Sequence, residues 1–460
     1  MRLLQADGDG LDGNLALQVL MADAEMSNTA LANAIVAGGR AEGVHLGTTT
    51  TSVRRMLDGC QPRWPVPRVV AEVLSRRLGY RVSVADCGFS DRAQDGDTFD
   101  GLRTAVTFGG TIATVAELSG RDLSRRNFML GSTFAAAAFA EPAWMAMTSG
   151  PARDLAEGGR IGRTDVEILR STVRHFERLH RVHGGGRVRP QVVQLVHQHS
   201  RAIRDGNYGE AVGRDFAGAL AEATFLAGLA TVDSGRHALG QRYFAQALGL
   251  AMRAGDQSFG ANVLAEMSVL TIDIGANSVD QREAGQAGQH AVSLARSAQH
   301  VIGGRATPAV SAYLHAVEAR SLSLLGDRQS SAVALDAAKR AFDRGPCDEP
   351  GWLSHYSEVD FTSDIGQCLR DIGRPQQGIA LLERAVADLP AGRVTSQVKT
   401  RIHIATAFLE LGEHDQAGRI TGEVINAMEG VASERIAERM KRLRKRAQQC
   451  GATQVDERLA

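Results

Sequence analysis

The chain has 460 residues, and 52 aspartates and glutamates balance 52 lysines and arginines, so its formal net charge is zero. Hydrophobic residues make up 43% of the chain and charged residues 23%, proportions that indicate a globular protein with more than one folding unit. Five scattered cysteines without a CxxC pair exclude a disulfide framework and a thiolate zinc site, and no apolar run reaches the roughly 18 residues of a membrane span, so we expect a soluble, cytoplasmic protein.

Residues 1–90 are predicted to form a compact domain of four or five short helices. In the stretch NLALQVLMADA apolar residues recur at helical spacing, and Ser27 is a favourable N-cap for a second helix that ends at Gly38-Gly39. A threonine begins a third helix, which runs to about Leu57. Three prolines then lead to the apolar stripe of VPRVVAEVLSRRLG.

The third of these helices has the features of a helix that reads DNA. It opens in hydroxyl residues, whose side chains and unpaired amides can bind phosphate oxygens or base edges, and it then offers two arginines, which can bind guanine bidentately. The helix before it, packed by Leu31 and Ile35, would complete a helix-turn-helix. We therefore predict contacts to double-stranded DNA by Thr49, Thr50, Thr51, Ser52, Arg54, Arg55 and Arg63.

The local charge supports this prediction. Residues 40–81 hold eight arginines and three acidic residues, a net charge of +5, whereas 1–39 hold five acidic residues and one arginine. A basic face of this kind favours DNA through the release of counterions. The alternative is that Arg54 and Arg55 only form a solvated helix face. We expect Val53, Met56 and Leu57 to be buried in the core of this domain.

Residues 91–160 are predicted to be a linker that contains one or two packed helices, one of them near 111–118. Within it, SRRNFMLGSTFAAAAFAEP (124–142) resembles a twin-arginine export signal with an Ala-Phe-Ala cleavage site. Either the true start lies further downstream and the protein is exported, or this stretch is an alanine-rich buried helix with a basic flank. We favour the buried helix, because export signals lie within the first few dozen residues.

Residues 161–450 are predicted to form an α-solenoid of tetratricopeptide-like repeats, which makes the whole chain all-α. The stretch DIGQCLRDIGRPQQGIALLERAVADLP (364–390) places glycine, leucine, alanine and proline at the offsets of that repeat. Further copies lie at 404–428 and 226–248, and weaker ones centre on Gly275 and Gly326. The expected turn glycines, about 40 to 50 residues apart, are Gly235, Gly275, Gly326, Gly373 and Gly412.

Each such repeat is a pair of antiparallel helices that buries its apolar face only by stacking on its neighbours, so we expect an arched superhelix. The last helix, SERIAERMKRLRKRAQQC, is highly charged and is interpreted as a solubilising cap. Residues 451–460 are predicted to be a disordered tail.

The stretch HLGTTTTSVRRMLDGCQPRWPVPRVVAEVLSRRLGYRVSVADCGF resembles the N-terminal module of actinobacterial Xre-type regulators with tetratricopeptide-like C-terminal regions. These include the NsdA type, which are negative regulators of sporulation and antibiotic production. HRVHGGG, DSGRHALGQRYFAQALGLAMRAGD and GQCLRDIGRPQQGIALLERA resemble the same family, as does the arginine-pair segment. The resemblance implies a repressor of secondary metabolism and development. Met56 departs from the family, which often has tryptophan there.

The concave face of such an arch binds peptides or small effectors through polar residues on the first helix of each pair. We predict a ligand or partner groove lined by Asn262, Tyr313, His315 and Arg320. The repeat that most resembles the family adds Asp233, Arg236 and Tyr243. For all seven residues the alternative is a role in packing between repeats.

Nothing in the sequence predicts a metal, a cofactor or catalysis. His175, His180, His183, His197 and His199 cluster, but they lack an HExxH pattern and a nearby cysteine. The run 184–186, three glycines, lacks the lysine of a phosphate-binding loop and is interpreted as a flexible turn between helices. Carboxylates such as Glu318 and Glu358 are expected to form ion pairs, so we do not expect an enzyme.

Together these features predict a cytoplasmic transcriptional regulator without membrane contact. Its helix-turn-helix would bind DNA, while the repeats form a homodimer and sense a peptide or small molecule. The alternative is a scaffold whose repeats bind a partner protein and whose N-terminal module does not bind DNA.

Overall fold

The computed structural model of the chain describes residues 14–41, 46–63, 65–78, 107–123 and 159–460 apart from 279, 346 and 354–355, together with 82, 84, 86–89, 101–102 and 105. Over these residues the fold is all-α, as predicted. The exception is a parallel pair of two-residue strands, β1 (Gly159–Arg160) and β2 (Gly206–Asn207). The chain divides into two units, Met1–Asp97 and Thr98–Ala460.

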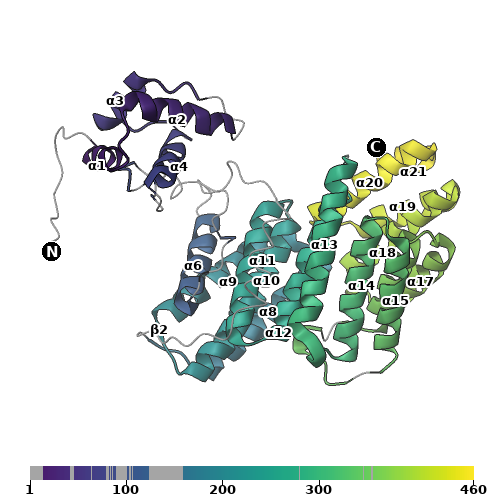
Figure 1. Cartoon of the computed structure of the whole chain (residues 1–460). Coiled ribbons are helices and arrows are strands. Elements are labelled where there is room, and N and C mark those ends of the chain that lie inside the picture. Colours follow the sequence, from purple (N-terminus) through teal and green to yellow (C-terminus); the bar gives the residue numbers. More distant parts are fainter. Residues whose placement is uncertain are drawn as a thin grey trace. The chain divides into compact units, whose positions relative to one another are not determined.

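The first unit is built around the apolar stripes of four helices (Figure 1). These are α1 (Leu15–Asp23), α2 (Asn28–Ala41), α3 (Thr50–Leu57) and α4 (Val66–Leu78). The fully buried core residues are Leu17, Leu31, Ile35, Val53, Val70 and Leu74. Because α2 packs against both α3 and α4, it is the central helix of this unit. The predicted core positions Val53 and Met56 are buried, and Leu57 is half-buried against the same core.

The second unit begins with α6 (Phe108–Leu123), which contains the helix predicted near 111–118 and packs against α9 and α11. Long helices follow it: α8 (Arg163–His183), α9 (Gly185–Asp205), α10 (Glu210–Val232), α11 (His237–Ala254), α12 (Gln257–Gly275) and α13 (Gln281–Ile302). The remainder comprises α14 (Pro308–Leu324), α15 (Arg328–Phe342), α16 (Glu358–Asp371), α17 (Pro375–Asp388), α18 (Val394–Leu411), α19 (His414–Ala427), α20 (Glu434–Cys450) and α21 (Thr453–Arg458), with the 3-10 turns η2 (Gly303–Arg305) and η3 (Gly351–Leu353). The arginine-pair segment 124–142 lies outside the described residues.

Consecutive helices of the second unit pack in pairs: α10 with α11, α12 with α13, α14 with α15, α16 with α17, and α18 with α19. Four of the predicted turn glycines, those at 235, 326, 373 and 412, adopt the positive φ that a turn between helices requires. The prediction for Gly275 is wrong, because it is the last residue of α12. A Cβ atom there would lie 2.7 Å from the Cβ of Ala287, so this glycine permits close packing of α12 against α13.

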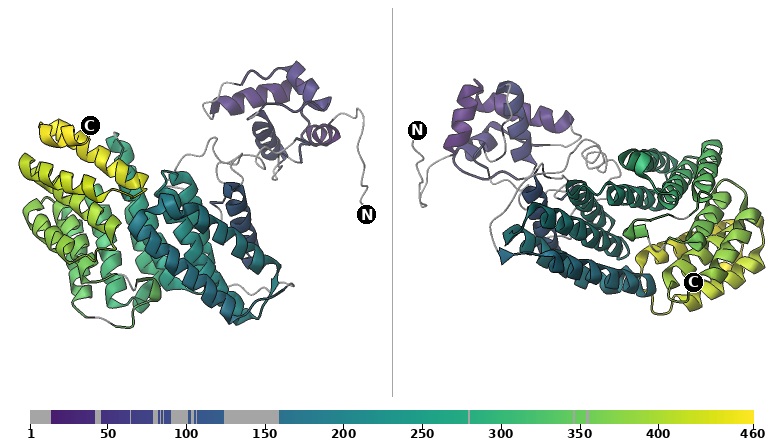
Figure 2. Two further views of the ribbon diagram at one scale, coloured as in Figure 1. Left: turned by 180° about the vertical axis from the view of Figure 1, so that it is seen from behind. Right: turned by 90° about the horizontal axis from the view of Figure 1, so that it is seen from below.

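The last helices of the second unit return to its first helices (Figure 2). The backbone amide of Ala432 donates to the carbonyl of His183, and that of Glu434 donates to the carbonyl of Asp233. The Thr395 hydroxyl donates to the carbonyl of Arg181 at 3.0 Å. The segment 430–440 and the start of α18 therefore close the curved array against α8 and α10.

The chain end corrects one prediction. Residues 453–458 form α21, and Ala452 and Val455 are buried against the core of the last helices, so 451–460 is not a disordered tail. The prediction that α20 is a solubilising cap is wrong for the face that carries Arg435 and Arg439, because these side chains are only 6% and 7% exposed.

Among the described residues, α10 is the one helix whose length and apolar composition would suffice to cross a membrane. Of its most apolar stretch, 83% is buried inside the unit, as in the core helix of a folded domain.

Candidate functional site

The helix α3 owes its start to hydroxyl side chains. The Thr49 side chain accepts a hydrogen bond from the amide of Ser52, and the Ser52 hydroxyl accepts one from the amide of Thr49, each at 3.3 Å. This reciprocal cap satisfies two amides that an eight-residue helix would otherwise leave unpaired. The polar run that opens the helix therefore has a structural role in addition to any contact with a ligand.

The paired arginines of α3 lie on its solvent side. Val53 and Met56 are buried against the first unit's core, whereas Arg54 and Arg55 are exposed. The other predicted DNA-binding residues are exposed or half-buried at the N-cap of this helix, on the helix itself or on the segment after it: Thr49, Thr50, Thr51, Ser52 and Arg63. No residue of this set is buried in the core, so α3 and the residues beside it present exposed hydroxyl groups and arginines to solvent.

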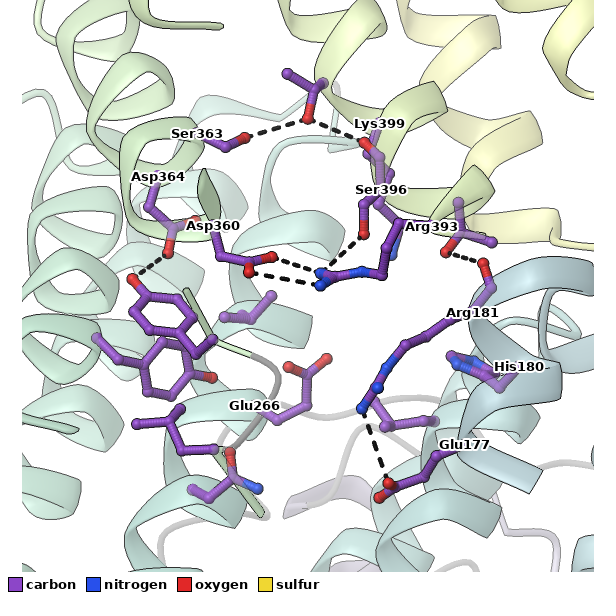
Figure 3. A pocket seen from close by; sticks show the side chains of 18 of the residues that line it. Glu177, His180, Arg181, Glu266, Asp360, Ser363, Asp364, Arg393, Ser396 and Lys399 are labelled. Atoms are coloured by element: carbon purple, nitrogen blue, oxygen red, sulfur yellow. Dashed lines mark hydrogen bonds and ion pairs between the residues drawn. The ribbon is translucent and has the colours of Figure 1, made fainter. Parts of the chain in front are cut away.

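The second unit contains a cavity of about 320 Å³, the size of small-molecule sites. Its wall comes from α8, from the first helices of the packed pairs (α10, α12, α14, α16 and α18), from η3 with the segment after it, and from α20, which closes the array. Figure 3 shows charged side chains from these helices around the cavity, among them Glu177, Arg181, Glu266, Asp360 and Lys399.

Three of the predicted groove residues line this cavity: Asn262, Tyr313 and Arg320. The other four do not line it. His315 lies 3.7 Å from Glu318. Asp233 is buried, accepts a hydrogen bond from the amide of Gly185 at 3.0 Å and lies 3.1 Å from His180.

The remaining two predicted groove residues meet on Asp122 of α6. The Tyr243 hydroxyl donates to the Asp122 carboxylate at 2.8 Å, and Arg189 donates to the same group. Arg236 lies 3.8 Å from it. These contacts fasten α6 to α9 and α11, so Tyr243 and Arg236 have the packing role that was the alternative interpretation.

Asp273, a buried residue of α12, binds three arginines of α20, two through its carboxylate and one through its backbone carbonyl. Asp273 accepts hydrogen bonds from Arg435 at 2.6 Å and Arg439 at 2.9 Å, and its backbone carbonyl accepts one from Arg442 at 3.0 Å. Burial raises the pKa of Asp273, but the arginines outweigh burial and hold its pKa well below the usual value. Arg435 also donates to Glu266 at 3.1 Å, so this cluster forms part of the cavity wall.

Aromatic side chains form another part of the wall. The ring of Tyr313 lies 5.5 Å from Tyr356 and 6.4 Å from Trp352, both edge to face. The Tyr356 hydroxyl donates to Asp364 at 2.8 Å. Burial raises the pKa of Asp364 to about 6, with Arg320 opposing the shift. The cavity thus offers an apolar, ring-lined surface next to ionised groups.

The pKa values of nearby basic groups are lowered. Burial, and then the charge of Arg435, lowers the pKa of Lys399 to about 8. Burial, and then Arg370 and Arg439, lowers the pKa of His403 well below its usual value. The imidazole is therefore neutral at pH 7, and because arginine can only donate, its Nδ1 accepts the 2.7 Å hydrogen bond from Arg370.

Several lining residues were not predicted from the sequence. They are Glu177, Arg181, Asp360, Asp364, Arg393, Lys399, Arg435 and Arg439. Most lie on the first helices of pairs, so the rule that selected Asn262 and Tyr313 would have found them if applied to every pair. Arg435 and Arg439 are different, because their helix has the composition of a surface helix.

Among the described residues no group of three or more histidine, cysteine, aspartate or glutamate side chains could hold a metal ion. The turn predicted at 184–186 is shorter than the triple glycine: only Gly184 lies between α8 and α9, and Gly185 and Gly186 begin α9. Cβ atoms at Gly184 and Gly186 would lie 2.5 and 3.0 Å from the carbonyl oxygen of Ala432. These glycines therefore allow the close contact that closes the array.

Residues 17–90 match the family model of the SP15 N-terminal domain. The match covers less than a fifth of the chain, falls within the first unit and includes α3. A comparison with curated proteins gave no match.

Proposed function

We propose that the protein is a cytoplasmic transcriptional regulator in which α2 and α3 form a helix-turn-helix and α3 reads double-stranded DNA. The observation that carries the proposal is the pair of adjacent, exposed arginines on a capped helix whose opposite face is buried in the core. Guanidinium groups in this position can bind phosphates or the edge of guanine.

The second unit is proposed to be a tetratricopeptide-like repeat region that forms a homodimer and receives the signal. Five successive helix pairs support this assignment, as does a cavity lined by the first helix of each pair. A homodimer would place two reading helices on half-sites about one helical turn apart. Occupancy of the cavity would shift the population between arrangements that can and cannot bind DNA. Repression of antibiotic production and sporulation rests on the sequence resemblance alone.

The test is the salt dependence of binding to the protein's own promoter fragment. Each phosphate contact contributes about 0.9 to the slope of log K against log salt concentration, so the full-length chain is expected to show a clear negative slope. Replacing Arg54 and Arg55 together with alanine is expected to flatten that slope by about 2 and to weaken binding at least tenfold.

The matched control replaces Arg201 and Arg204, two exposed arginines of α9, with alanine. It removes the same charge from a surface that the proposal does not place on DNA, so its slope should equal that of the unchanged chain. Absence of binding by the unchanged chain at low salt contradicts the proposal and leaves the scaffold alternative. Equal slopes for the two double variants would contradict it as well.

A further inference from the structure

The cavity in the second unit adjoins a second one of about 810 Å³, and the walls of both carry an excess of positive charge. The two share Arg320, Gln367, His403 and Arg439 as lining residues, so they meet at these side chains. Together their walls hold eleven lysines and arginines but only seven carboxylates. The chain as a whole is neutral, so this net charge of +4 is a local concentration.

Positive charge that is removed from water is costly unless an anion pairs with it. Among the described residues, Lys399 has neither a hydrogen bond nor an ion pair, although it lies in the cavity wall. The Nε atoms of Arg320 and Arg439 are buried and have no hydrogen-bond partner in the described part of the chain. Two cationic groups at the junction and one in the wall of the inner cavity thus retain unused hydrogen-bond donors.

The junction also contains a neutral donor. Since the Nδ1 atom of His403 accepts from Arg370, the proton of this neutral imidazole is on Nε2. Carboxylates nearby are already engaged: Asp273 is bound by Arg435 and Arg439, and Asp364 accepts from a tyrosine. The protein therefore provides donors at this junction beyond those that its own acceptors satisfy.

We infer that Arg320, His403 and Arg439 at the junction, together with Lys399 one turn before His403 on α18, bind the oxyanion, phosphate or carboxylate, of a small molecule. The apolar body of this molecule would pack on Tyr313, Trp352 and Tyr356. Charge-assisted hydrogen bonds from guanidinium and ammonium groups are the strongest that a protein offers to such a group. The claim that this small molecule is the effector rests on the proposed function. The claim that the site binds such an anion does not, and it is tested without DNA.

The closed array favours a small molecule over an extended peptide. An open concave surface lets a peptide pass along the whole arch. Here, α20 is bonded to Asp273 of α12, and the segment before it is bonded to His183 and Asp233. With a volume of about 320 Å³, the inner cavity is at the lower end of the range for small-ligand sites.

The experiment is calorimetric titration of the full-length chain with phenyl phosphate, benzoate and phenol in a phosphate-free buffer. Saturable binding of at least one anion, without binding of phenol, is expected, and the preferred anion identifies the group that the effector carries. Arg320→Gln and Lys399→Gln should each weaken that binding about tenfold or more, because each removes a charged donor. The matched controls Arg305→Gln and Lys441→Gln, at exposed positions outside both cavities, should bind as the unchanged chain does.

Three results would overturn the inference: no saturable binding of either anion, binding of phenol as tight as that of the anions, or undiminished binding by the cavity variants. Circular dichroism checks that each variant is folded. If Arg320→Gln fails to fold, Lys399→Gln decides, because Lys399 makes no hydrogen bond or close ion pair in the described structure whose loss would disturb the fold. Failure here overturns this inference alone, whereas failure of the DNA assay overturns the proposed function alone.

Discussion

Lys399 places an ammonium group in a cavity wall where the nearest charges include Arg435 and Arg439 as well as Asp233 and Glu266. Its pKa falls from 10.5 to about 8, first because of burial. Between these two pH values the unfolded chain binds a proton that the folded chain does not. The charged lysine thus destabilises the fold below pH 8, and the cost disappears as the pH rises toward 10.5.

The resulting prediction concerns Lys399→Met in phosphate-free buffer. At pH 7 the variant should be more stable than the unchanged chain by on the order of 2 kcal/mol, and the difference should vanish as the pH rises through about 8 to 10.5. Urea unfolding at a series of pH values measures it. Lys441→Met, an exposed control, should show no such pH-dependent difference. A constant difference for Lys399→Met across this range would contradict the account.

At the scale of elements, the connection between α8 and α9 determines whether the array can close. Gly185 lies where the start of α9 contacts the end of α10. A Cβ atom added to it would lie 2.6 Å from the Cβ of Asp233 and 2.7 Å from the Cα of Ala230. Neither neighbour is the end of a flexible side chain, so the helices would have to move apart. The sequence HRVHGGG is thus explained by close packing.

We expect Gly185→Ala to destabilise the second unit by about 1 to 3 kcal/mol through overpacking. Gly285 provides the matched control, since it lies inside α13 with no atom near its Cβ position. Gly285→Ala should be neutral or should stabilise by about 0.5 to 1 kcal/mol, because alanine favours a helix interior. Thermal unfolding of both variants measures the contrast. Equal effects of the two substitutions would be evidence against a tight contact at Gly185.

The difference between predicted and observed elements has a physical pattern. The helical stripes of the first unit and the turn glycines at 235, 326, 373 and 412 depend on local periodicity and backbone conformation, so the sequence predicts them correctly. Gly275 has the same spacing but serves helix packing, which spacing alone does not reveal. The prediction of a disordered tail at 451–460 is wrong because two apolar residues, Ala452 and Val455, are buried and dock it.

On the scale of the whole molecule, the cavity was only partly predictable. Asn262, Tyr313 and Arg320 could be selected because they lie on first helices of pairs. Arg435 and Arg439 could not be selected, because the sequence of a charged helix does not distinguish a buried arginine from a solvated one. Their burial depends on the contact of α20 with Asp273, which precedes them by 162 and 166 residues in the sequence.

The measurement that tests the central claim most directly is a footprint of the ligand-free, full-length chain on genomic DNA. The account predicts protected segments with two half-sites about one helical turn apart, which disappear when Arg54 and Arg55 are replaced by alanine but persist when Arg201 and Arg204 are replaced. Absence of any protected segment at low salt, or the same protection by the Arg54 and Arg55 variant, would contradict it.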